Sequence, residues 1–292
     1  MILIGESIHV ISKEVNDAVQ TRNAKVIQDL TRAQAAAGAD YIDLNLGPAK
    51  RDPEETTQWL VNAIQQVTDL PIAVDTMNSV AMEAGLKICK ARPLLNSASG
   101  KAASKEKMMP LAKTYGTDVV ISVITDAGCP PDVDARVESI VETVTYANDL
   151  GIPNEDIWVD PIILPISADQ KQAVEDLEFM KILDDLLPGV KSTVGLSNIS
   201  NGTPDELRGI INRTYLVMLE KNGLYSAIVD VLDPELVSLT KGELPGICDL
   251  IYKVMDGETV DIASLSKKEQ DYVKTAKVIM GETLYSHAWL ES

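Results

Sequence analysis

Aromatic residues and paired cysteines are scarce in this chain. Aromatic side chains make up 4% of the 292 residues, with a single Phe, whereas hydrophobic residues make up 45%. The core must therefore be aliphatic, and we do not expect the ring-rich surfaces on which single-stranded nucleic acids stack. The three cysteines, Cys89, Cys129 and Cys248, lie far apart. Their odd number and spacing argue against a zinc motif or a disulfide framework and are typical of free thiols in a reducing compartment.

Basic residues are also few. The 26 Lys and Arg stand against 44 Asp and Glu, which gives a net charge of −18. This charge repels nucleic-acid phosphates and anionic membranes, so we expect neither as a partner. No apolar run reaches the ~20 residues of a membrane span. The first residues, MILIGESI, turn polar too early for a secretory signal. We therefore expect a cytoplasmic protein.

Eight short β-branched runs alternate with longer segments of helical spacing. The runs are nearly continuous apolar stretches, as expected for parallel strands covered by helices. They occupy residues 2–6, 41–47, 71–76, 93–99, 118–125, 157–163, 192–198 and 226–233. An α/β barrel commonly spans about 250 residues as one unit. The alternation therefore predicts an α/β fold, a single-domain (β/α)8 TIM barrel over residues 1–292, with a doubly wound open sheet as the lesser alternative.

Three of the intervening segments carry signals of helix ends. Residues 53–67 start with proline and two acidic side chains, and residues 133–151 end on glycine. Residues 203–223 open with Thr203, an expected N-cap, and a Glu follows three positions later. These signals predict three helices between the runs.

The pattern changes after the eighth run. Residues 240–268 contain three glycines and a proline and end in a polar stretch. We interpret them as an insertion in the eighth unit that could serve partner docking or dimerisation. An amphipathic helix over about 268–290 is expected to close the barrel.

Carboxylates and amides stand toward the carboxyl ends of the runs, where barrel enzymes place their active sites. Any one of these residues could simply cap the following helix. However, four of the carboxylates lie within apolar runs, and burying an unpaired carboxylate costs several kcal/mol, so partners are expected. The four are Asp43, Asp75, Asp160 and Asp230, and the remaining polar residues are Glu6, Asn45, Asn96, Ser197 and Asn198.

Other residue types are missing from these strand ends. No lysine stands there, which disfavours a Schiff-base aldolase, and the turn GLSN lacks a glycine-rich phosphate loop. His9 and His287 are the only histidines and are far apart, so no metal site is expected. A carboxylate accepts two parallel hydrogen bonds from a ring N–H and an adjacent amine. The set therefore fits a flat, nitrogen-rich ring such as a pterin, and a guanine-like ring fits equally well.

Seven stretches, taken in order, resemble the pterin-binding methyltransferases. The resemblance is to methyltetrahydrofolate:corrinoid iron–sulfur protein methyltransferases and to the related methyltransferases of corrinoid-dependent O-demethylase and betaine-demethylase systems. Each motif alone is weak, but their joint order covers most of the chain. The stretches are DLNLGPA at 43–49, VDTMN at 74–78, LLNSAS at 94–99, VDPIILP at 159–165, GLSNIS at 195–200, INRTYL at 211–216 and SAIVDVLD at 226–233.

The resemblance implies an enzyme that moves a methyl group between N5 of (methyl)tetrahydrofolate and the cobalt of a cobalamin-type corrinoid on a partner protein. It also implies a homodimer. Asp75, Asn96 and Asp160 match residues that hydrogen-bond the pterin, and Asn198 matches a mobile amide that reaches N5. N5 is a poor leaving group without a proton or hydrogen bond in the transition state. Asn198 would stabilise that proton, and Asp75 and Asp160 would orient the ring and tune the network.

Further matches lie beside the same turn. Gly195 and Ser197 line it, Arg208 matches an arginine near the ligand, and Asn201 is close to where the corrinoid approaches. One departure is the sequence GESIH after the first run, where family members often have GERIN. It favours the direction from methyl-corrinoid to tetrahydrofolate. The alternatives are a dihydropteroate synthase-like enzyme, for which we find no diphosphate-binding basic set, and a non-catalytic pterin-binding barrel.

Overall fold

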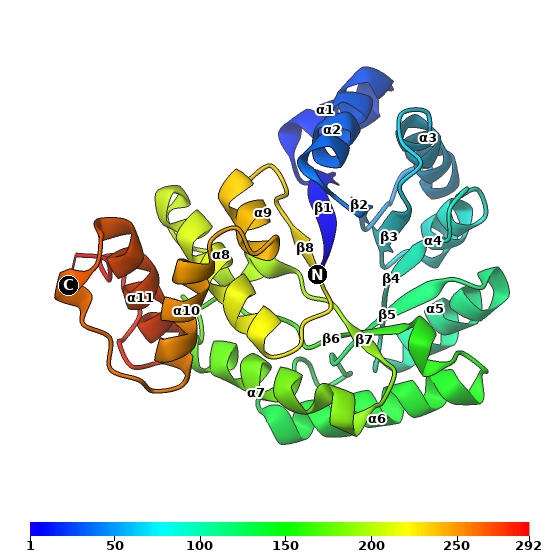
Figure 1. The fold of residues 1–292 in the computed structure, drawn as a ribbon. Coiled ribbons are helices and arrows are strands. Elements are labelled where there is room, and N and C mark those ends of the chain that lie inside the picture. The colour runs from blue at the N-terminus through cyan, green and yellow to red at the C-terminus, as the bar shows by residue number, and fades with distance from the viewer. Residues whose placement is uncertain (292) are drawn as a thin grey trace.

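The computed structural model describes residues 1–291 and contains eight parallel strands surrounded by helices (Figure 1). Neighbouring strands pair in the order β7-β6-β5-β4-β3-β2-β1-β8. The strands are β1 Ile2–His9, β2 Tyr41–Gly47, β3 Ile72–Thr76, β4 Leu94–Ser99, β5 Asp118–Ser122, β6 Ile157–Asp160, β7 Lys191–Ser192 and β8 Ser226–Val229.

Hydrogen bonds between the last two strands close the ring. The N–H of Ile228 donates to the carbonyl of Val194 at 2.8 Å, and the Ser226 hydroxyl donates to the carbonyl of Ser192 at 2.9 Å. The predicted (β/α)8 TIM barrel is therefore confirmed, and the open sheet is not observed. The seventh strand was predicted too long, because residues Leu196–Ser200 form a 3-10 helix, η2, instead of a strand.

Helices cover the outside of the barrel and connect successive strands (Figure 1). They are α1 Lys13–Thr21, α2 Ala24–Ala37, α3 Pro53–Gln65, α4 Ser79–Leu86, α5 Ala102–Tyr115, α6 Val133–Asp149, α7 Gln170–Leu186, α8 Asp205–Lys221, α9 Pro234–Thr240, α10 Pro245–Met255 and α11 Lys267–Ile279. Two further 3-10 helices are η1 Asn154–Asp156 and η3 Ile262–Ser264. Among the described residues, none of the helices is both long enough and apolar enough to span a membrane.

The predicted helix starts at Pro53 and residue 133 agree with α3 and α6, but the predicted cap of α8 is wrong. Pro204 occupies the N-cap position of α8. The Thr203 hydroxyl instead makes a hydrogen bond of 2.8 Å with the hydroxyl of Tyr285. This contact ties the start of α8 to the C-terminal segment.

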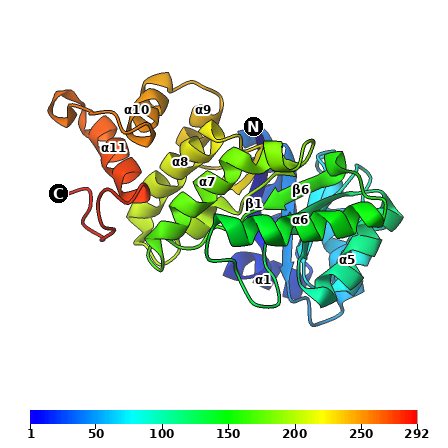
Figure 2. The same cartoon turned by 90° about the horizontal axis from the view of Figure 1, so that it is seen from below.

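The chain after α9 packs on the outside of the barrel. Helices α10 and α11 contact each other and α8, and both lie away from the strands (Figures 1 and 2). Residues 240–268 thus contain α10 and η3. Helix α11 ends at Ile279, short of the expected residue 290, and Gly281 follows it in the left-handed conformation. Helix α11 packs against α8, so it does not close the barrel as expected.

The amino-terminal half of the barrel interior is filled by apolar side chains. An inner cluster consists of Ile4, Ala73, Leu94, Val120 and Trp158, each from a different strand. The Trp158 ring meets Tyr41 and Tyr225 edge-on, with centroids 5.7 and 5.3 Å apart. Because these groups pack the amino end, polar groups inside the barrel are left to the carboxyl end, the mouth of the barrel.

Candidate functional site

The strand alternation aims a set of polar side chains into the mouth. In a strand, residues two apart point to the same side. Each of these polar residues lies two positions beyond a residue that belongs to the inner cluster or packs against it on the same strand. They therefore share the interior side of the barrel. The residues are Glu6 of β1, Asp43 of β2, Asp75 of β3, Asn96 of β4 and Asp160 of β6.

Two amides hold two of the carboxylates. The Asn96 amide donates to Asp43 Oδ1 at 3.4 Å, and both residues are buried. The Asn45 amide donates to Asp75 Oδ2, while its own Oδ1 accepts from the N–H of Gly47 at 3.0 Å. Each carboxylate keeps oxygen lone pairs that these bonds do not use. The structure thus brings Asp75, Asn96 and Asp43 together, from three adjacent strands.

Burial and mutual repulsion raise the pKa values of the carboxylates in the mouth. Burial, followed by repulsion from Asp160, raises the pKa of Asp75 to about 7. Burial raises the pKa of Asp160 to about 6, against the opposing hydrogen bond from the N–H of Ile162. The pKa of Asp43 is well above its usual range because of burial and then of Asp75. Asp75 and Asp160 therefore change protonation near neutral pH, so they can act as acceptors or donors.

No cation neutralises this group within residues 1–291. Asp43, Asp75 and Asp160 form no ion pair there. Nor does that part of the chain hold three or more His, Cys, Asp or Glu side chains arranged to bind a metal ion. Buried carboxylates without a cation require hydrogen-bond donors, which the protein supplies only in part. The unmet capacity indicates a ligand rich in N–H groups.

A strained loop and a buried arginine hold Asp160 in place. Ile162 has φ 65°, a left-handed conformation that is unusual for a β-branched residue, and its N–H donates to Asp160 Oδ1 at 2.8 Å. The Arg136 guanidinium donates to the carbonyl of Pro161 at 3.3 Å. Arg136 pairs with Asp176 at 2.9 Å, and both side chains are fully buried. Helices α6 and α7 therefore position the loop that follows Asp160.

The turn after β7 brings Glu6 and Ser197 together. The Ser197 hydroxyl donates to Glu6 Oε1 at 2.6 Å. Burial raises the pKa of Glu6 to about 7, and nearby Asp230 adds repulsion, while Ser197 and Arg208 oppose the rise. The Arg208 side chain donates to the hydroxyl of Ser200 at 3.1 Å. A carboxyl that can exchange a proton near neutral pH thus lies beside η2.

Gly195 makes room for the Asn198 side chain. A Cβ at Gly195 would lie 3.0 Å from Asn198 Nδ2, closer than ordinary contacts. Asn198 is exposed, and its Oδ1 accepts from the Asn201 amide at 3.3 Å. The amide of Asn198 is thus held by few bonds and is exposed to solvent.

Three residues that the sequence singled out lie outside this arrangement. Asp230 was predicted to be buried in a strand, but β8 ends at Val229 and Asp230 is exposed. Its Oδ1 accepts from the N–H of Leu232 at 3.0 Å, which closes a turn. His9 Nδ1 accepts from the N–H of Ser12 at 3.2 Å. His287 contacts a tyrosine ring of the C-terminal segment. All three make local contacts, and Asp230 also lies close enough to Glu6 to raise its pKa.

The main cavity of the mouth has a volume of about 600 Å³. It is lined by Asn45, Gly47, Pro48, Asp75, Thr76, Met77, Asn78, Ser79 and Lys107. A second cavity of about 280 Å³ shares Met77 and Lys107 with it. Sequence reasoning gave neither residue a role: Met77 lies in the VDTMN stretch beside Asp75, whereas Lys107 lies inside α5, where nothing in the sequence marks it.

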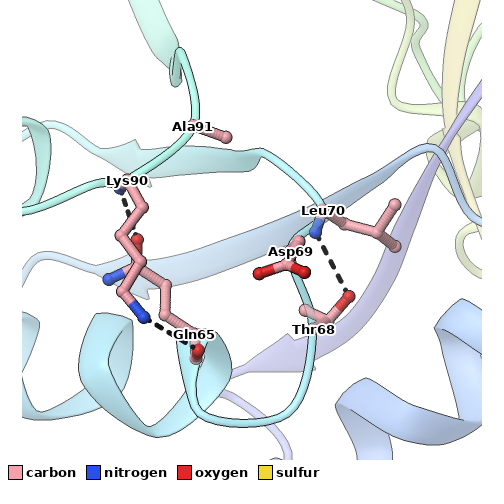
Figure 3. Close-up of a pocket in the computed structure, with 6 residues that line it drawn as sticks. All are labelled: Gln65, Thr68, Asp69, Leu70, Lys90 and Ala91. Atoms are coloured by element: carbon pink, nitrogen blue, oxygen red, sulfur yellow. Dashed lines mark hydrogen bonds between the residues drawn. The ribbon is translucent and has the colours of Figure 1, made fainter.

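A cavity of about 220 Å³ lies at the opposite, amino-terminal end of β3 and β4 (Figure 3). Its polar groups already bind one another. The Lys90 N–H donates to Gln65 Oε1 at 2.6 Å, its ammonium donates to the Gln65 carbonyl at 3.3 Å, and the Leu70 N–H donates to the Thr68 hydroxyl at 3.2 Å. With its donors satisfied and no mouth residue nearby, this cavity is not the candidate site.

Comparison with known proteins gives a consistent result. Residues 12–230 match the family model described as pterin binding enzyme. A methylcorrinoid:tetrahydrofolate methyltransferase of Eubacterium limosum is 28% identical over 79% of this chain and 85% of that enzyme. A methionine synthase of Mycobacterium leprae is 27% identical over 78% of this chain, which spans only 20% of that larger enzyme.

Solved structures extend the likeness to the three-dimensional level. A dihydropteroate synthase of Xanthomonas albilineans in complex with 7,8-dihydropteroate has a TM-score of 0.61 and 18% identity, covering 83% of this chain and 92% of that one. The Yersinia pestis dihydropteroate synthase has a TM-score of 0.62 and 15% identity, covering 84% and 93%. At these identities the likeness shows a common fold alone.

Proposed function

The chain belongs to the pterin-binding enzymes, and on that premise we propose that it moves a methyl group from a methyl-corrinoid protein to N5 of tetrahydrofolate. The observation that carries the proposal is the group of Asp43, Asp75, Asn96 and Asp160, whose carboxylates form no ion pair within the described residues and of which Asp75 lines the main cavity. The relative from Eubacterium limosum, whose name states this direction of transfer, supports the same choice.

The carboxylates and amides of the mouth suit the edge of a pterin. A pterin presents a ring N–H next to an exocyclic amine, and a carboxylate accepts both in parallel. Asp75 and Asp160 come from separate strands, so together they fix the ring in one orientation. Because their pKa values are about 7 and about 6, either can also donate to a ring nitrogen when protonated.

In this proposal, residues at and beside the turn after β7 act on the proton at N5. In the proposed direction the bond between N5 and the methyl carbon forms as the carbon–cobalt bond breaks, and N5 gives up one proton. The Asn198 amide cannot accept that proton itself, but it can stabilise the changing charge at N5. Glu6, held by Ser197 in the same turn, has a pKa of about 7 and can take the proton up.

In this proposal a partner protein brings the corrinoid to the mouth, and the corrinoid carries the methyl group. Three large apolar side chains are exposed on loops that follow the strands at this end. They are Ile11, 85% exposed, Met77, 86% exposed, and Leu232, 44% exposed. Exposed apolar side chains around a site fit a surface that another protein covers. The Arg208 guanidinium donates to Asn201 Oδ1 at 3.5 Å, and both residues are proposed contacts of the ligand or partner.

The cobalt spectrum tests the proposed function directly. The protein is mixed with methylcobalamin and tetrahydrofolate, and in the reverse direction with Co(I) cobalamin and methyltetrahydrofolate. We expect loss of the methyl-cobalt spectrum and formation of methyltetrahydrofolate. No change in either direction, with free cobalamin and with corrinoid proteins alike, contradicts the proposal. So does formation of dihydropteroate from p-aminobenzoate and a pterin diphosphate.

The variant Asn198→Ala tests the role given to this residue. We expect the rate of methyl transfer to fall about 100-fold, as when a donor that acts in a transition state is removed. The dissociation constant for tetrahydrofolate should rise by less than about 10-fold, the effect of one ordinary hydrogen bond. Asn62→Ala, on the exposed side of α3, serves as the control. Equal losses in rate and affinity would make Asn198 a binding residue only.

A further inference from the structure

Strand β1 contains one extra residue near its carboxyl end. Between two paired positions, β1 advances three residues, from Gly5 to Ile8, while β2 advances two, from 42 to 44. Glu6 and Ser7 therefore oppose a single residue of β2. An extra residue of this kind is a β-bulge, which locally bends the strand and changes the direction of its side chains.

The bulge lets Glu6 and Ile8 point to opposite sides of the barrel wall. In a regular strand, residues two apart point to the same side. Glu6 follows the inward-pointing Ile4 by two positions and points into the mouth. Ile8 instead pairs with Leu44, which follows the inward-pointing Asp43 and faces the helices, and Ile8 is fully buried in the outer core. The inward position of Glu6 therefore depends on the bulge.

Gln34 of helix α2 holds the bulge from the helix side. Its Oε1 accepts from the N–H of Ser7 at 2.9 Å. Gly5 makes room for this contact, because a Cβ at Gly5 would overlap with Gln34 Oε1. Gln34 is fully buried, and its amide nitrogen has no hydrogen-bond partner within the described residues. Burying a half-satisfied amide is costly, so an apolar side chain would suit this position better if packing were its only task.

We propose that Gln34 is a positioning residue, which keeps the Glu6 carboxyl in the mouth by holding the bulge of β1 and touches no ligand itself. The inference rests on the proposed function, in which Glu6 takes up the proton released from N5. The Ser197 hydroxyl donates to Glu6 at 2.6 Å, so α2 and the turn after β7 fix the carboxyl from two directions. The charged groups that face Glu6 are Asp43, Arg208 and Asp230.

The Glu6 carboxyl can be observed by nuclear magnetic resonance without any ligand. Its signal in protein labelled at the glutamate carboxyls is identified by its loss in Glu6→Gln, and its shift is followed against pH. Gln34→Met keeps the size of the side chain but removes the acceptor. In this variant the pKa of Glu6 should fall from about 7 toward its usual 4.5, because a displaced carboxyl regains contact with water.

Thr31→Val is the matched control for Gln34→Met. Thr31 is also fully buried on α2, but its hydroxyl donates to the carbonyl of Ile27 within the helix and not to β1. The control loses one buried hydrogen bond, as Gln34→Met does, and should leave the pKa of Glu6 unchanged. An unchanged pKa in Gln34→Met, or an equal fall in both variants, overturns the inference.

The rate of methyl transfer tests the same contact in two independent ways. Gln34→Met removes the acceptor, and Gly5→Ala displaces it by steric overlap. Both should slow transfer about 10-fold, since a well-placed proton acceptor contributes about 10²- to 10⁴-fold. The dissociation constant for tetrahydrofolate should not change, because this proton moves only during the reaction.

A double-variant comparison separates positioning of Glu6 from general packing. In the Glu6→Gln background, Gln34→Met should cause no further loss of rate, because the group that it positions is gone. Losses that multiply in Glu6→Gln/Gln34→Met would show that Gln34 acts elsewhere and would overturn the inference. Absence of methyl transfer in the unaltered protein contradicts the proposed function instead. The pKa of Glu6, measured without ligand, then still decides whether Gln34 positions this carboxyl.

Discussion

The two ends of the barrel treat acidic side chains in opposite ways. At the amino end, Asp118 on β5 pairs with Arg92 at 3.0 Å and approaches Lys191 at 3.8 Å. Burial raises the pKa of Asp118, but these two cations oppose the rise. At the mouth, Asp75 and Asp160 have no cation within the described residues. The chain thus supplies cations to the carboxylate at the amino end and none to those at the mouth, as the proposed ligand site requires.

The pair of Arg136 and Asp176 shows the same difference among fully buried side chains. Asp176 has no exposed side-chain surface, and Arg136 neutralises it at 2.9 Å. The hydroxyl of Tyr215 donates to Asp176 as well, at 3.3 Å. Asp160 lies close enough to repel Asp176, yet it has no such partner. Depth alone therefore does not decide which carboxylates the chain neutralises.

Arg136→Met is expected to have the largest effect, because it removes the cation from a structural carboxylate. It leaves Asp176 buried and unpaired, which destabilises a protein by about 3–5 kcal/mol. Urea unfolding at pH 7 measures the loss. Arg136→Met/Asp176→Asn removes both charges and should recover most of the stability. A loss below about 1 kcal/mol in the single variant would show that the buried pair does not matter for stability.

The variant Asp75→Asn tests the comparison at the mouth of the barrel. It should weaken tetrahydrofolate binding by about 10- to 100-fold, since hydrogen bonds to charged groups contribute about 1.5–3 kcal/mol. The shape and the bond to Asn45 can remain similar, so the loss reports the charge. Calorimetric titration measures the affinity. Unchanged affinity would remove Asp75 from the proposed pterin site.

The variant Asp160→Asn tests how the carboxyl of Asp160 makes the free energy of unfolding depend on pH. The folded-state pKa of Asp160 is about 6, above its usual value of 3.8, so the folded protein favours the protonated form. Its contribution to stability is complete below about pH 4 and is lost as pH rises through 6. Asp160→Asn should gain about 1–3 kcal/mol relative to the unaltered protein between pH 4 and pH 8. Paired urea titrations at both pH values check the sign.

Such a gain would appear as a difference between two proteins, which cancels the titrating groups that do not interact with Asp160; the pKa of Asp75, which Asp160 raises, should fall in the variant. A gain of equal size at pH 4 and pH 8 would mean that the carboxylate is not strained by burial. Stabilisation with simultaneous loss of folate affinity would show that Asp160 is retained for the ligand at the expense of the fold.

Much of the barrel could be predicted from the sequence because its strands are continuous apolar runs. Alternation within those runs also placed Asp75, Asn96 and Asp160 on the same side of the barrel. The seventh run failed as a strand, since its second half bends into η2. Asp230 failed as a buried group because β8 ends one residue earlier. Where a strand ends depends on its neighbours' hydrogen bonds, which a single sequence does not display.

Contacts between distant helices could not be predicted at all. Arg136 and Asp176 lie in separate helices, and nothing in either segment indicates that they pair. The same holds for Lys101 and Lys107, which resemble ordinary surface lysines in the sequence. Only the packing of α5 against β4 and β5 places them on a cavity. The family roles of Gly195, Ser197, Asn198, Asn201 and Arg208 remain predictions.

Asp118→Asn should have the smallest effect and sharpens the comparison most cleanly. Arg92 is half exposed, so its pair with Asp118 contributes about 0–1 kcal/mol, and removing the buried charge offsets part of that loss. Unfolding should change by less than about 1 kcal/mol, and the change should shrink as salt is raised. The affinity for tetrahydrofolate should not change, because the inner cluster separates Asp118 from the mouth. If Asp118→Asn weakened folate binding as much as Asp75→Asn, the chemical distinction between the two ends of the barrel would be wrong.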